Sequence, residues 1–116
     1  MLNSEDDSSW QNGDYINHKN LKTLLENRAK TLHPMDSFNL SNSNLEHINL
    51  VNMGSKNGFV FTNANLYKCN FENAHCFKIN FSGSSLMKAN FKNANLHCAN
   101  LQNCNLLGVK FENTKL

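Results

Sequence analysis

From residue 38 onward, the apolar residues recur at every fifth position. Starting from Phe61, every fifth residue up to Leu116 is Leu or Phe, with Cys76 as the exception. The residue two places before each of these centres is small or apolar, and Asn recurs one place before it. A period of five fits neither the 3.6-residue period of an amphipathic helix nor the alternation of a plain strand. The pattern therefore predicts a repeat architecture in which each pentad is one short structural unit.

Identical centres recur at every fourth pentad, as in the series Phe71, Phe91 and Phe111. In a coil with four sides of one pentad each, such positions stack, and stacked rings fill a narrow interior without voids. An earlier block, residues 38–50, follows the same frame offset by one, so a single-residue insertion near 51–58 joins the two blocks. The centres predicted to form the structural core are Phe61, Leu66, Phe71, Phe81, Leu86, Phe91, Leu96, Leu101, Leu106 and Phe111.

Several pentads share one motif. It begins with a small residue, continues with Asn and then with Leu or Phe, and ends with two further residues. The matching runs are ANLYK, CNFEN, ANFKN, ANLHC, ANLQN and CNLLG. This motif closely resembles that of the pentapeptide-repeat family, and the resemblance covers residues 38–116. It implies an all-β solenoid, a right-handed quadrilateral β-helix of about four coils, in which each coil consists of four pentads. We assign residues 36–116 to this β-helix.

The segment 17–35 precedes the repeats, and we expect it to contain one amphipathic helix. Its leucines fall on one face of a helix with 3.6 residues per turn, and Pro34 is a stop signal. Such a face needs a partner surface, so we expect a short N-terminal α-helix that packs on the first coil as a cap. The leucines of this face are Leu21, Leu24, Leu25 and Leu32.

The segment 1–16 is polar and acidic, and we predict that it forms a flexible tail. It carries four acidic residues and no Lys or Arg, which gives a charge of −4, whereas the remaining 11 basic and 5 acidic residues give +6. Neither value is typical of a nucleic-acid-binding protein, so no nucleic-acid partner is expected. No stretch approaches the roughly 18 apolar residues of a membrane span. The start also lacks a secretory signal, which favours a cytoplasmic protein.

The sequence carries no recognisable catalytic motif, neither a Gly-rich phosphate loop nor an HExxH pair. The four cysteines form no CxxC pair, and in the cytoplasm we expect them to be reduced. His75, His97 and Cys98 fall on one predicted face, but we interpret them as surface residues rather than metal ligands. We therefore expect no enzymatic activity, no cofactor and no bound metal.

The residue that follows each centre should point to solvent. At these positions Tyr67, Met87 and Leu107 form one apolar column, and Phe77 lies on another face. Exposed apolar patches often mark contact surfaces, although single apolar residues are also common on protein surfaces. These four residues are the candidates for binding a protein partner, which the sequence does not identify.

The sequence thus favours a non-catalytic protein–protein interaction or scaffolding module, either alone or as a regulatory domain of a longer protein. A homodimer is an alternative, formed through the apolar column or through the C-terminal end, where the chain stops at the repeat centre Leu116. The resemblance implies a further alternative, because some pentapeptide-repeat proteins mimic B-form DNA and bind DNA gyrase. That mechanism needs an acidic surface. It is disfavoured here, because residues 59–116 carry six Lys and only two Glu.

Overall fold

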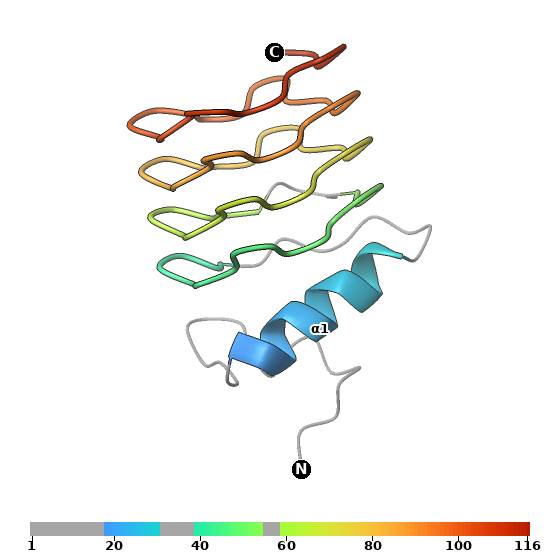
Figure 1. The fold of residues 1–116 in the computed structure, drawn as a ribbon, viewed down its shortest axis with the longest axis vertical. Coiled ribbons are helices and arrows are strands. Elements are labelled where there is room, and N and C mark those ends of the chain that lie inside the picture. Colours follow the sequence, from blue (N-terminus) through green and yellow to red (C-terminus); the bar gives the residue numbers. More distant parts are fainter. Residues whose placement is uncertain (1–17, 31–38, 55–58) are drawn as a thin grey trace.

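The computed structural model describes residues 18–30, 39–54 and 59–116. One helix, α1 (His18–Ala29), lies beneath a stack of coils that climbs away from it (Figure 1). The near side of each coil runs from left to right while the chain climbs, so the superhelix is right-handed. The predicted tail, 1–16, lies outside the described residues.

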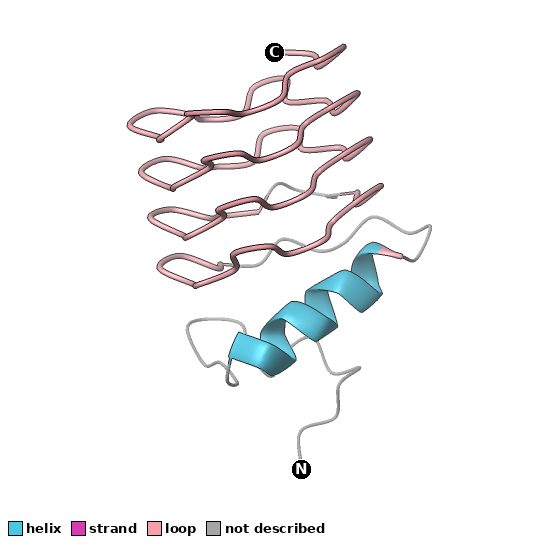
Figure 2. Cartoon of the chain, viewed as in Figure 1, coloured by secondary structure: helices cyan, strands magenta, loops and turns pink. Residues whose placement is uncertain are grey.

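Neighbouring coils meet through isolated parallel β-bridges, and Figure 2 accordingly shows the described part of the coils as loops and turns. From Val60 onward, each bridge joins positions four pentads apart, as in Val60–Asn80 and Asn90–Lys110. Each coil therefore has four sides of one pentad each, as the sequence predicts.

The first coil differs from the others by one residue. Its bridges to the second coil, from Asn39–Val60 to Gly54–His75, each span one position more than four pentads. The extra residue therefore enters between Gly54 and Val60, in the segment where the change of frame in the sequence places it.

Hydrogen bonds between coils use three of the five amides in a pentad. In the pentad around Phe71, the amides of Phe71 and Asn73 donate to carbonyls of the coil above at 2.7 and 2.9 Å. The amide of Asn70 donates to the coil below at 2.9 Å. Each middle coil is therefore bonded to both of its neighbours along every side.

The other two amides are satisfied within the pentad. Ala74 donates its amide to the carbonyl of Phe71 at 3.0 Å, which closes a turn. The amide of Glu72 donates to Oδ1 of Asn70 at 2.9 Å, the local bond that Asn side chains form readily at turns. The side chain of the recurring Asn thus accepts a hydrogen bond from a backbone amide that bonds to neither the coil above nor the coil below.

The core consists of ring stacks that meet edge to face. Phe61 and Phe81 are stacked with ring centroids 5.4 Å apart, and Phe71 and Phe91 with centroids 5.1 Å apart. The two columns contact each other at nearly right angles, as in the 83° between Phe71 and Phe81. Both geometries are favourable for aromatic pairs, so the rings form one continuous ladder along the axis.

Burial of the predicted core changes along the stack. The predicted centres from Phe61 to Leu96 are at most 2% exposed. Those of the last coil are only partly buried, because no described coil lies above them. These partly buried centres are Leu101, Leu106 and Phe111.

Helix α1 lies within the predicted segment 17–35, of which residues 31–35 are outside the described part of the chain. The helix ends at Ala29, and Lys30 lies in a turn. The amide of Lys30 bonds to the carbonyl of Asn27 at 3.3 Å, the i to i−3 bond of a tightened last turn. Leu32 and Pro34, like the side chains of Leu21 and Leu24, lie outside the described residues.

Two residues of α1, Leu25 and Ala29, are buried in the same cluster as the coils. They lie four residues apart and therefore on one helix face. This contact attaches the helix to the lower end of the hydrophobic core.

Helix α1 also bonds to the lower edge of the first coil. The carboxylate of Glu26 accepts the amide of Asn49 at 2.8 Å, and Nζ of Lys22 donates to the carbonyl of Glu46 at 2.7 Å. In higher coils, the corresponding amides and carbonyls pair with the coil below. Lys22 and Glu26, one turn apart, thus replace a donor and an acceptor that a preceding coil would supply.

We predict that Glu26→Ala lowers the free energy of unfolding by about 1–2 kcal/mol, because the Asn49 amide loses a charged acceptor. Urea denaturation followed by circular dichroism measures the change. Asn27→Ala, an exposed position on the same helix, is the control. Equal stabilities of the two variants would contradict the prediction.

The residue two places after each centre has a positive φ. Seven of these fourteen residues are Asn and two are Gly, but Lys68, Lys78 and Lys88 adopt φ values of 55°, 62° and 60°. The left-handed conformation costs most residues about 1–2 kcal/mol, whereas Asn and Gly adopt it readily. The three lysines are therefore less favourable choices for the turn than Asn would be.

We predict that Lys88→Asn raises the free energy of unfolding by about 1 kcal/mol, because Asn relieves the cost of the left-handed conformation. Chemical denaturation of the variant and of the unchanged protein provides the comparison. Lys92→Asn removes the same charge at a position without positive φ, and it should bring no gain. A similar gain in both variants would show that charge, and not conformation, is responsible.

Candidate interaction surface

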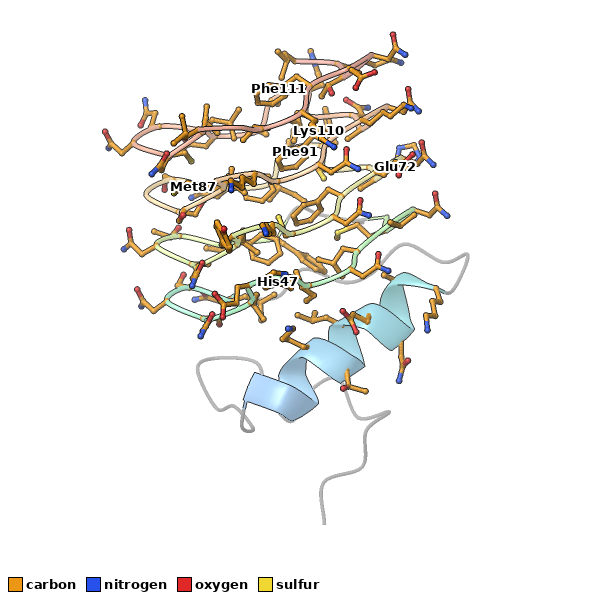
Figure 3. All side chains as sticks on the ribbon, in the orientation of Figure 1. His47, Glu72, Met87, Phe91, Lys110 and Phe111 are labelled. Atoms are coloured by element: carbon orange, nitrogen blue, oxygen red, sulfur yellow. The ribbon has the colours of Figure 1, made fainter. Side chains whose placement is uncertain are left out.

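One corner of the β-helix presents a column of apolar side chains. The turns at 67–68, 87–88 and 107–108 lie above one another, because four pentads, the length of one coil, separate them. Tyr67 and Met87 are half-buried, and Leu107 is 67% exposed. We call the surface formed by Tyr67, Lys68, Met87, Lys88 and Leu107 the Tyr67 corner. Met87 is labelled on the third coil in Figure 3.

The Tyr67 corner combines apolar and basic groups. Nζ of Lys68 lies 5.5 Å from the centre of the Tyr67 ring, within the range of a cation–π contact. The His47 ring of the coil below meets Tyr67 edge to face at 5.7 Å. Lys68 and Lys88 are both exposed. The corner therefore offers apolar contact beside positive charge, which suits a segment that carries aromatic or aliphatic groups and carboxylates.

Phe77 belongs to a different surface. It follows Tyr67 by two pentads, which is half a coil, and therefore lies at the opposite corner. Its ring is 41% exposed and stacks on His97 at 5.8 Å, with Nζ of Lys78 at 5.2 Å from its centre. The structure thus divides the four candidate residues into two separate surfaces.

The cysteines differ in exposure. Cys69 and Cys76 are buried in the core, whereas Cys98 is exposed. Burial raises the pKa of the Cys76 thiol, and burial together with the neighbouring Cys76 raises the pKa of Cys69 well above its usual value. A protonated thiol is a poor nucleophile. Sγ of Cys104 donates to the carbonyl of Phe81 at 2.9 Å, a structural role.

Metal ligands do not gather in the described part of the chain. Among residues 18–30, 39–54 and 59–116, no group of three or more His, Cys, Asp or Glu residues is arranged to hold a metal ion. In the same part of the chain, no helix has the length and apolar character needed to cross a membrane.

His47 and Glu46 were not identified as site residues from the sequence. Glu46 lies one coil below Tyr67, and its carbonyl receives the bond from Lys22. The sequence does contain this relation. When the one extra residue between the two frames is counted, Glu46 and His47 fall beneath Tyr67 and Lys68. The change of frame near 51–58 conceals this relation.

The comparison with family models confirms the resemblance found in the sequence. Residues 74–113 match the model for pentapeptide repeats in eight copies. This segment therefore consists of pentapeptide repeats. No curated protein matches the chain at a significant level.

Three of the solved structures that are similar to the chain are as follows. HetL, a pentapeptide repeat protein involved in heterocyst differentiation regulation in Nostoc sp. strain PCC 7120, is 24% identical over 67% of this chain and 38% of its own, with a TM-score of 0.43. A pentapeptide repeat protein from the Arabidopsis thaliana thylakoid lumen is 24% identical over 67% of this chain and 54% of its own, with a TM-score of 0.37. Rfr23 from the cyanobacterium Cyanothece 51142 is 28% identical over 74% of this chain and 67% of its own, with a TM-score of 0.31. The chain thus spans less than two thirds of the first two proteins.

We predict that a thiol reagent modifies Cys98 in the folded protein but modifies Cys69 and Cys76 only after unfolding, because burial keeps these two thiols protonated and out of solvent. Mass spectrometry after brief labelling at pH 8, with and without denaturant, identifies the modified residues. The control is Cys98→Ser combined with Cys104→Ser, which should remove the fast labelling, because Cys104 is only partly buried. Rapid labelling of Cys76 in the folded protein would contradict the burial that the core requires.

Proposed function

We propose that the chain is a non-catalytic protein–protein interaction module that binds its partner through the Tyr67 corner. The exposure of Leu107 supports this most directly, because a Leu that is 67% exposed continues a column of apolar side chains instead of standing alone. Contiguous exposed apolar surface of this kind is typical of binding sites.

The construction of the coils supports a scaffolding role. The middle pentads satisfy most of their amides within the stack, and the aromatic ladder fills the interior. Side chains at the corners are therefore held at a regular spacing. A preorganised surface loses less conformational entropy on binding, so a small corner on such a scaffold can bind specifically.

We also propose that α1 is the N-terminal cap of the β-helix. An open edge of paired backbone can accept a further strand from another molecule. The bonds of Lys22 and Glu26 to the first coil, together with burial of Leu25, support this role. The cap would thus prevent nonspecific pairing at the lower edge, so that binding takes place at the Tyr67 corner.

A cytoplasmic location is part of the proposal. It is supported by the spacing of the four cysteines in the sequence, which form no CxxC pair and which we expect to be reduced. The gyrase-binding alternative is less well supported, since the lysines at the Tyr67 corner give it the opposite charge to DNA.

The test is a variant in which Tyr67, Met87 and Leu107 are each replaced by Ser. We predict at least about tenfold weaker capture of the partner, because the loss of buried contacts worth about 1.4 kcal/mol reduces affinity tenfold. Affinity purification from the source cells with quantitative mass spectrometry measures the loss.

The matched control carries Thr62→Ala, Ser82→Ala and Gln102→Ala at the adjacent corner, and circular dichroism verifies the fold of both variants. The control should retain the proteins captured by the unchanged chain. An identical capture profile for all three proteins would exclude the Tyr67 corner as the binding surface.

A further inference from the structure

The segment that precedes α1 starts near the base of the Tyr67 corner. Nζ of Lys22 donates to the carbonyl of Glu46, and Glu46 lies one coil below Tyr67. His18, the first residue of α1, is one helical turn before Lys22, which is about 6 Å along a helix. His18 is therefore separated from Glu46, beneath the corner, by one helical turn and the length of the Lys22 side chain.

The length of this segment is sufficient to follow the corner. The segment 1–16 spans up to about 50 Å when extended, and the longest extent of the molecule is 41 Å. Coils in a stack lie about 4.8 Å apart, so Leu107, three coils above Glu46, is only about 14 Å higher. The segment can reach every residue of the corner without being stretched.

The chemistry of the segment 1–16 complements that of the corner. The segment carries four carboxylates and no basic residue, and the corner exposes Lys68 and Lys88. The segment also contains Trp10, Tyr15 and Ile16, which can cover the half-buried and exposed apolar side chains. Paired charges select the partner and its alignment, and apolar contact adds affinity.

We infer that the acidic segment 1–16 docks along the Tyr67 corner of its own chain, with its carboxylates beside Lys68 and Lys88 and Trp10 against the apolar column. This goes beyond the proposed function, because the occupant comes from the chain itself. An external partner of the corner then has to displace an internal segment of the same chemistry.

Trp10 is the only tryptophan in the chain, so tryptophan fluorescence reports on the surroundings of this one residue. The reference is a synthetic peptide of residues 1–17, in which the indole is in water. We expect the full chain to emit at a shorter wavelength than the peptide and to be quenched less by acrylamide. High salt, about 1 M, should return both values toward those of the peptide, since it shortens the Debye length to about 3 Å.

Two double variants locate the contact. Lys68→Glu with Lys88→Glu, and Met87→Ser with Leu107→Ser, should each give the emission of the peptide. The control, Lys78→Glu with Lys115→Glu, makes the same change of charge at exposed positions away from the Tyr67 corner and should retain the shorter wavelength. Exposed lysines tolerate substitution, so the charge variants remain informative if Met87→Ser with Leu107→Ser fails to fold.

Three results would overturn the inference. These are a full chain that emits like the peptide, a shift that persists in both corner variants, and a shift that appears only as protein concentration rises, which would place the segment on a second copy. None of these results depends on an external partner. Failure of the internal contact is therefore distinguishable from failure of the proposed binding function.

Discussion

The left-handed residue at each corner is the constraint on which the rest of the structure depends. It turns the chain sharply, so that each side is short enough to present one large and one small side chain inward. Its own amide, as in Asn73, and the amide of the centre two places before it, as in Phe71, donate to the next coil. The aromatic ladder and the corner surfaces follow from this repeated turn, because both require positions four pentads apart to superimpose.

Much of the fold could be predicted from the sequence, because the constraint is periodic. The spacing of Leu and Phe predicts the four-sided coil, and the break in frame predicts the extra residue before Val60. The role of Asn70 could not be obtained in this way. Recurrence shows that a residue is required, but only the direction of the amides shows that its side chain accepts a hydrogen bond.

The non-periodic parts were predicted less well. The end of α1 at Ala29 depends on local competition between i−3 and i−4 bonds, which a stop signal at Pro34 does not reveal. At the surface, the spacing alone places Phe77 half a coil from Tyr67, but the exposed fraction of each side chain depends on its neighbours. The contact between Lys22 and Glu46 joins segments with different periods, so no pattern in either segment indicates it.

The direction of the hydrogen bonds gives the stack a polarity. In each middle coil, two amides per side donate upward and one donates downward, so the upper and lower edges display different groups. A second molecule can continue the register only in the same orientation, and two like edges cannot pair in this way. Growth by stacking in register would therefore require every molecule to have the same orientation, and a helix that covers one edge, as proposed for α1, would be sufficient to prevent it.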